Sequence, residues 1–259
     1  SQEQINLTER TQPLLLSSSV AVWRVWMDEN GAMPAVLAGH SLGEWSALVC
    51  AGAVKFEDAV GIVRSRGALM QDAVPVGIGA MAAIIGLDDE SICQSCADAR
   101  GDEVVDAVNF NAPGQVVIAG SADAVGRAIE LCKAAGAKRS LPLPVSAPFH
   151  TSLMAPAAEG LTEQVRSVMF SAPEIPVIHN VHGQSESDPA VVKKLMLEQI
   201  YSPVRWVDCV LELRRRGAEQ FVECGPGRVL SGLSKRINRE IVSFSTDDVA
   251  SLKNALATV

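Results

Sequence analysis

Apolar side chains recur every three or four positions in several segments of the chain, which is the spacing of one helix face. In residues 18–28, Val20, Trp23 and Trp26 follow this spacing, and Asn30-Gly31 marks an end. A further helix is predicted between Ser41 and Cys50. The same pattern predicts helices at 57–73, 88–99, 122–135, 157–170, 190–200, 204–216 and 228–238, and a last helix beyond 244.

Short apolar runs bounded by turn residues predict strands at 34–38, 81–85, 104–110, 115–119, 138–143, 176–181, 220–224 and 241–244. Strands that alternate with helices indicate an α/β protein with a mostly parallel, hydrolase-like sheet covered by helices. Residues 77–145 differ, because their order is β-α-β-β-α-β, the ferredoxin-like arrangement. We therefore expect a large subdomain from residues 1–76 and 146–259, with residues 77–145 inserted as a small subdomain.

Composition narrows the choice of partners. The chain has 259 residues, 48% of them hydrophobic, and a formal net charge of −8. An acidic chain with 4% aromatic residues argues against a nucleic-acid partner, which needs basic patches or stacking rings. No apolar run approaches the length of a membrane span, and residues 1–11 contain no apolar signal segment. A cytoplasmic protein is expected.

The six cysteines do not form a recognisable metal or disulfide framework. Cys93 and Cys96 make a lone C-x-x-C with no second ligand pair at zinc-site spacing. They are interpreted as two helix residues three positions apart, and no metal is expected.

Gly39-His40-Ser41-Leu42-Gly43 fits G-x-S-x-G between a predicted strand and a predicted helix. In that context the pattern indicates a nucleophile elbow, a tight turn that exposes the serine hydroxyl. The helix that follows points its N-terminal N–H groups toward a developing oxyanion. The pattern therefore favours acyl chemistry on Ser41.

A serine nucleophile needs a base, and the sequence has four histidines. His40 adjoins the serine, and neighbouring side chains point apart. His179 and His182 lie in a predicted strand at a spacing that would place them on opposite faces. His150 follows the inserted segment in a Pro-rich loop and is the best candidate. No single Asp or Glu stands out to orient it.

Several motifs in order resemble the malonyl-CoA:acyl-carrier-protein transacylases of fatty-acid synthesis, over about residues 12–237. They are GHSLGE at 39–44, Arg66-Gly67, NFNAPGQVVIAG at 109–120, Phe149-His150, YSPVRW at 201–206 and ECGPG at 223–227.

The resemblance implies roles for individual residues. Ser41 would attack the malonyl thioester, and His150 would act as general base and then general acid. The backbone carbonyl of Gln199 would hold the histidine, which explains the missing carboxylate. The N–H of Leu42 would donate to the oxyanion, and Arg66 would bind the free malonyl carboxylate, as a guanidinium fork suits a planar anion.

Three further positions follow from the same resemblance. Phe149 would limit the size of a substituent on the malonyl group. Asn111 and Gln115 would lie near the active cleft, although turn and strand capping explains them equally well.

The implied partners are malonyl-CoA and acyl carrier protein, with no cofactor of the enzyme's own, because the carrier brings the phosphopantetheine. The family also has an N-terminal strand and a Gly-Gln-Gly-Ser-Gln loop that supplies a second oxyanion donor, and residues 1–4 do not match them. Two alternatives stay open: a serine thioesterase or esterase on the same elbow, and an inactive fragment that binds carrier protein.

Overall fold

The computed structural model describes residues 5, 7–145 and 147–259. Its helices are α2 (Thr8–Asp28), α3 (Leu42–Cys50), α4 (Phe56–Asp72), α5 (Asp89–Arg100), α6 (Ala122–Ala134), η1 (Ser152–Met154, a 3₁₀-helix), α7 (Ala155–Ser167), α8 (Pro189–Glu198), α9 (Trp206–Arg215), α10 (Val229–Ile237) and α11 (Val249–Thr258). Its strands are β1 (Leu37–Ala38), β2 (Gly79–Ile85), β3 (Val105–Ala112), β4 (Gln115–Ser121), β5 (Arg139–Pro142), β6 (Val177–Ile178), β7 (Gln220–Glu223) and β8 (Val242–Ser245).

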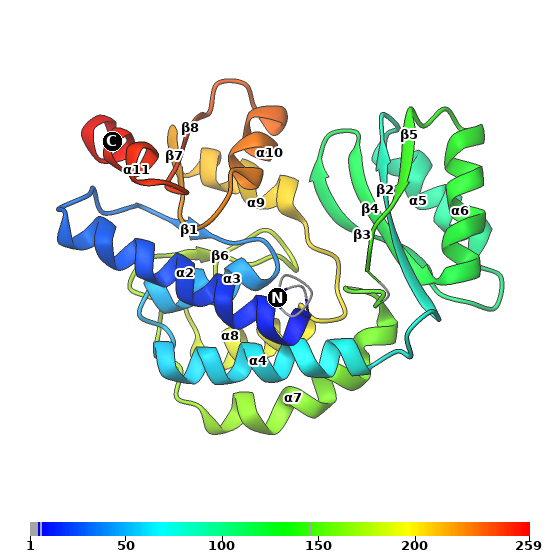
Figure 1. Cartoon of the computed structure of the whole chain (residues 1–259), viewed down its shortest axis with the longest axis horizontal. Coiled ribbons are helices and arrows are strands. Elements are labelled where there is room, and N and C mark those ends of the chain that lie inside the picture. The colour runs from blue at the N-terminus through cyan, green and yellow to red at the C-terminus, as the bar shows by residue number, and fades with distance from the viewer. Residues whose placement is uncertain (1–4, 6, 146) are drawn as a thin grey trace.

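The segment from β2 to β5 gathers at one end of the molecule, apart from the remaining helices and strands (Figure 1). The division of the chain at 76/77 and 145/146 stays a prediction. Residues 1–4, on which the mismatch with the family's N-terminal loop was observed, lie outside the described residues, as does Ser146.

In this smaller lobe, four antiparallel strands lie in the order β3-β4-β2-β5. Side chains alternate between the two faces of such a sheet. Ile84, Val105 and Ile118 belong to a buried cluster that includes residues of α5 and α6. Met81 and Val108 belong to a separate cluster, against which Phe149 packs. The predicted ferredoxin-like arrangement is confirmed.

The larger lobe holds the parallel strands, so the predicted α/β class is confirmed. β1 pairs with β6, and β7 pairs with β8, both parallel. Among the described residues, these parallel strands form two separate pairs. A trough of about 620 Å³ is lined by residues of both β1 and β7.

The first helix is much longer than predicted. α2 begins at Thr8, ten residues before the predicted start, and continues through Pro13. Its first turn lies against Gly67 of α4, where an added Cβ would come within 2.6 Å of the Thr8 carbonyl oxygen. Packing against α4 thus overrides the weak local helix signal of this segment.

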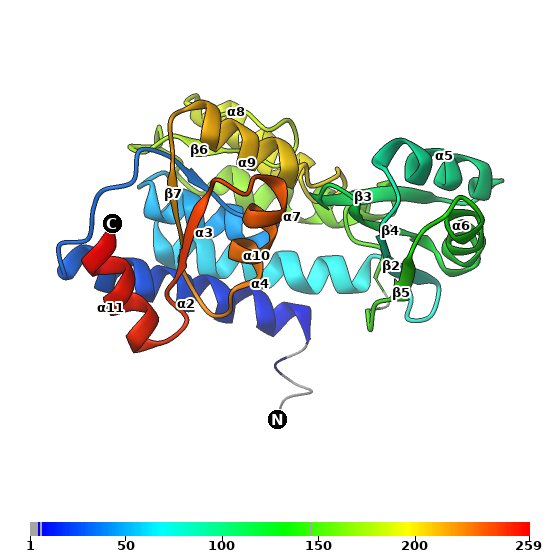
Figure 2. The ribbon, with the colours of Figure 1, turned by 90° about the horizontal axis from the view of Figure 1, so that it is seen from above.

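Backbone hydrogen bonds join the two lobes. The N–H of Val204, just before α9, donates to the carbonyl of Val108 at 2.8 Å, and the N–H of Phe110 donates back to Val204 at 3.0 Å. β3 therefore has a short parallel bridge to the larger lobe as well as its partner β4. Seen from above, β3 is the strand of the smaller lobe that lies toward α9 (Figure 2).

Candidate active site

Ser41 lies on a strained turn between β1 and α3. Its backbone has φ 51° and ψ −107°, which a non-glycine residue rarely adopts. The turn is tight enough that a Cβ at Gly39 would lie 1.9 Å from the Gly43 carbonyl carbon. An added Cβ at Gly43 would meet nothing within 4 Å among the described residues. Close approach thus requires glycine at position 39 but not at position 43.

The serine and the histidine predicted from sequence lie in contact. Ser41 Oγ is 2.9 Å from His150 Nε2, and His150 Nδ1 is 2.8 Å from the Gln199 carbonyl oxygen. A carbonyl only accepts, so Nδ1 carries the proton and Nε2 is free to accept one from the serine. The imidazole is 4% exposed and is therefore shielded from water.

Burial, together with the positive charge of Arg66, lowers the pKa of His150 to about 3. The imidazole is therefore neutral at physiological pH, which is the form a general base needs.

Arg66 is buried beside the nucleophile. Its Nη2 donates to Ser41 Oγ at 3.2 Å and to Gln199 Oε1 at 2.9 Å, and Nη1 donates to Gln12 Oε1 at 2.7 Å. Burial lowers the pKa of its guanidinium to about 10, so the group stays charged at neutral pH. Its Nε finds no partner among the residues that the structure describes. A buried cation with an unused donor suits an anionic substrate group.

Sequence reasoning missed Gln12, which lies on α2 and is 6% exposed. Gly67 explains how Gln12 reaches Arg66, because the close approach of α2 to α4 at that glycine brings the two helices together. The Arg66-Gly67 pair therefore combines a cation with the contact point for its partner helix. The sequence did contain one signal, because the family resemblance begins at about Gln12.

Asn180 was also missed. Its Oδ1 accepts the N–H of Ser41 at 2.7 Å, and its Nδ2 donates to the Gly39 carbonyl at 2.8 Å. The side chain thus holds the backbone on both sides of the turn. Asn180 is 139 residues from Ser41 along the chain, and no local motif marks it.

The remaining predicted residues have different surroundings. Leu42 begins α3, so its N–H is among the first helical amides, which have no partner within the helix. Phe149 packs against the large core and against the face of the four-stranded sheet opposite α5 and α6. Asn111 Oδ1 lies 2.8 Å from His40 Nε2. Gln115 accepts from Arg236 of α10 instead.

The other three histidines are not part of the Ser41–His150 pair. His40 contacts Asn111 and the ring of Trp206, and burial lowers its pKa. The expectation that His179 and His182 face opposite sides is wrong, because their ring centroids are 6.0 Å apart. The reason is that β6 ends at Ile178, so both histidines lie in a turn where strand alternation does not apply.

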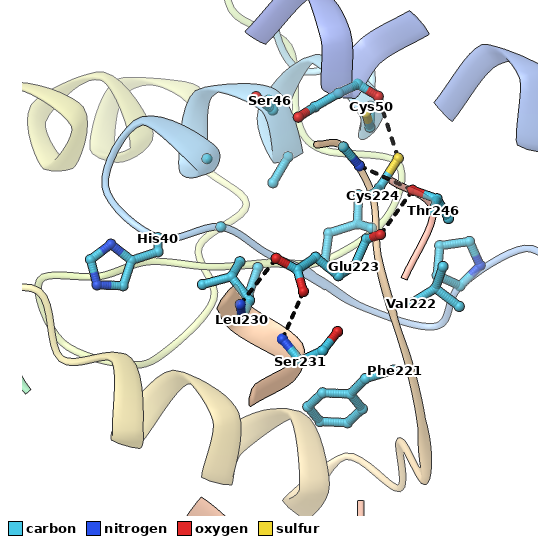
Figure 3. Close-up of a pocket in the computed structure, with 18 of the residues that line it drawn as sticks. His40, Ser46, Cys50, Phe221, Val222, Glu223, Cys224, Leu230, Ser231 and Thr246 are labelled. Atoms are coloured by element: carbon cyan, nitrogen blue, oxygen red, sulfur yellow. Dashed lines mark hydrogen bonds between the residues drawn. The ribbon is translucent and has the colours of Figure 1, made fainter. Parts of the chain in front are cut away.

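The trough beside β1 and β7 is a separate space. His40 lines it, with Gly39, Leu42 and Gly43, whereas Ser41, His150 and Arg66 do not. In Figure 3, the Glu223 carboxylate accepts the N–H groups of Leu230 and Ser231 at the start of α10. This side of the trough is therefore a structural junction between β7 and α10.

The site as a whole combines a serine, a neutral base oriented by a carbonyl, and a buried cation. This set can form and break an ester on Ser41 with an acyl group that carries its own negative charge. Among the residues described, no group of three or more His, Cys, Asp and Glu is placed to hold a metal. None of the described helices combines the length and apolarity needed to span a bilayer.

Comparison with known proteins agrees with this chemistry. Residues 1–252 match the acyl transferase domain family. The chain is 52% identical over 254 residues to the malonyl CoA-acyl carrier protein transacylase of Salmonella typhimurium, covering 98% of this chain and 82% of that protein. The Bacillus subtilis protein of the same name is 46% identical over 259 residues, covering 99% and 81%.

Solved structures show the same fold. An acyl carrier protein S-malonyltransferase from Vibrio cholerae superposes with a TM-score of 0.96 at 57% identity, covering 97% of this chain and 82% of that one. A malonyl-transacylase in complex with its type II polyketide-synthase acyl-carrier protein gives a TM-score of 0.98 at 49% identity, covering 100% and 84%.

Proposed function

Because the chain belongs to the acyl transferase family of malonyl CoA-acyl carrier protein transacylases, we propose that it moves a malonyl group from coenzyme A to a carrier-protein thiol through an ester on Ser41. It is an acyltransferase whose partners are malonyl-CoA and acyl carrier protein. The loaded carrier supplies extender units for fatty-acid synthesis, as the sequence resemblance implies.

In the first half-reaction, Ser41 Oγ attacks the thioester carbonyl while His150 Nε2 takes the hydroxyl proton. The negative oxygen of the tetrahedral intermediate lies at the start of α3, where the Leu42 N–H donates to it. The intermediate then collapses, the carbon–sulfur bond breaks, and His150 returns the proton to the leaving thiolate. This leaves a malonyl-serine ester and free coenzyme A.

The second half-reaction reverses these steps with another thiol. His150 takes the proton of the carrier's phosphopantetheine thiol, and the sulfur attacks the ester carbonyl. Ser41 leaves and regains its proton from His150. The Gln199 carbonyl keeps the imidazole in one tautomer throughout, because it accepts from Nδ1 in both halves.

The observation that carries this proposal is the buried Arg66 guanidinium, 3.2 Å from Ser41 Oγ. A cation at that distance would bind the free carboxylate of malonate while the thioester lies over the serine. A thioesterase or esterase for neutral acyl groups gains nothing from a buried charge, which is costly to desolvate. Phe149, Asn111 and Gln115 are proposed as flanking positions of the same cleft.

We place the reaction in the cytoplasm and assign the enzyme no cofactor of its own. All six cysteines are free thiols, which suits a reducing compartment.

The test is intact mass after brief exposure to malonyl-CoA, with Ser41→Ala beside the wild type. A single malonyl adduct, absent from the variant, is expected. Loss of the adduct after addition of holo-carrier, with malonyl on the carrier, would distinguish transfer from hydrolysis. Well-folded protein that forms no adduct would contradict the proposal and favour a role in binding the carrier.

A further inference from the structure

A buried carboxylate lies behind the catalytic residues. Glu44 is the third residue of α3 and is 0% exposed. Its Oε2 accepts the Gln199 side-chain amide at 2.6 Å and the Asn180 N–H at 3.1 Å, and its Oε1 is 2.7 Å from His179 Nδ1. None of these contacts takes part in the proton transfers described above.

Gln199 serves the site with both of its carbonyl groups. Its backbone oxygen holds His150, and its side-chain oxygen accepts from Arg66. Arg66 has donors and no acceptor, so the amide must turn its oxygen toward Arg66. The amide nitrogen must then find acceptors on the other side, which are Glu44 Oε2 and the Ser41 carbonyl, the latter at 2.9 Å.

Glu44 fixes this orientation. Its Oε2 faces two N–H donors, so it is an acceptor whichever atom holds the proton between Oε1 and His179. If the amide of Gln199 flipped, its oxygen would face the Glu44 oxygen and its nitrogen would face the guanidinium. Both contacts would be repulsive in a buried setting, where unmade hydrogen bonds are costly.

The same carboxylate supports the nucleophile. Asn180 donates its N–H to Glu44 and uses its side chain to hold Ser41 and Gly39. Glu44 also lies in the first turn of α3, where the helix dipole stabilises negative charge. The Glu44 carboxylate is thus linked both to the turn that carries Ser41 and to the Gln199 amide that accepts from Arg66.

We propose that Glu44 is a positioning residue that sets acyl-group selectivity, by holding the Gln199 amide so that Arg66 is aligned for an acyl carboxylate. The inference rests on the proposed function. It predicts that removing the acceptor at position 44 impairs malonyl loading more than acetyl loading, because only the former uses Arg66.

The test compares single-turnover loading of Ser41 from malonyl-CoA and from acetyl-CoA. In Glu44→Met, which keeps the side-chain length without an acceptor, the malonyl-to-acetyl ratio of rate constants should fall about tenfold. Glu44→Gln retains an oxygen for Gln199 and Asn180 and should stay within about twofold of wild type. The matched control is Glu212→Met, because Glu212 is also buried but pairs with Arg215 and Arg216 at the end of α9, and its ratio should not change.

The ratio is independent of how much protein is active, so a purely structural role would leave it unchanged. An unchanged ratio in folded Glu44→Met overturns the inference. If that variant does not fold, Glu44→Asp replaces it, since the shorter carboxylate withdraws from Gln199, and an unchanged ratio there has the same meaning. Failure of the wild type to take malonyl would instead contradict the proposed function itself.

Discussion

His150 Nδ1 lies 2.8 Å from the backbone carbonyl oxygen of Gln199, so the base is oriented by an atom that side-chain substitution does not remove. The side chain of the same residue holds Arg66. Orientation of the base and support of the cation are therefore separable by mutation, although one residue provides both.

Gln199→Ala tests this separation. The variant keeps the carbonyl but loses the acceptor for Arg66, so malonyl loading of Ser41 should fall about tenfold while acetyl loading stays within about threefold. Rapid-quench loading assays with the two acyl-CoAs measure both, and Gln94→Ala, on the surface of α5, is the control. Equal loss with both substrates would show that the side chain serves the base as well.

Arg66→Ala removes the proposed carboxylate clamp. Malonyl loading should fall about 100-fold or more, the usual effect of removing one member of a buried charge pair, and the preference should shift toward acetyl groups. Arg64→Ala is the matched control, because Arg64 lies two positions away on α4 but is exposed. An unchanged preference in Arg66→Ala would exclude the clamp.

The pH dependence of loading should reveal the influence of Arg66 on His150. His150 acts as a base only when neutral, so activity is lost as the pH falls through its pKa, which burial and the charge of Arg66 lower to about 3. Wild-type loading from acetyl-CoA should therefore be flat from neutral pH down to the acid limit of folding. In Arg66→Ala the pKa rises, and the acid limb should move up toward the ordinary value. A flat profile in both proteins would contradict this coupling.

Gly39→Ala should prevent the elbow from closing. The added Cβ would lie 1.9 Å from backbone atoms of Gly43, so the free energy of unfolding should fall by about 3 kcal/mol or more. Gly126→Ala is the control, because Gly126 lies within α6 and a Cβ there meets nothing within 4 Å among the described residues. It should raise stability by up to about 1 kcal/mol. Urea unfolding measures both, and equal stability of the two variants would contradict the close approach.

The elements that sequence predicted well depend on local signals. The ends of α3, α5 and α6 are set by neighbouring glycines and acidic first turns, and the G-x-S-x-G motif combines strand, turn and helix in five residues. The start of α2 was missed because its stability comes from contact with Gly67 rather than from its own residues.

The residues of the candidate site also divide into those with a local sequence signal and those without one. Ser41, His150 and Arg66 were found because each lies in a recognisable motif. Gln12, Asn180 and Glu44 act by hydrogen bonds to residues 54, 139 and 155 positions away, respectively. Their residue types are common, and their roles arise only when distant segments meet in the fold.

The backbone bonds between Val204 and β3 have a kinetic consequence. A motion that separated β3 from the segment before α9 would have to break both bonds, exposing buried main-chain groups each time. We therefore expect this junction to stay closed during turnover. Release of coenzyme A should accordingly proceed without separation of these two segments.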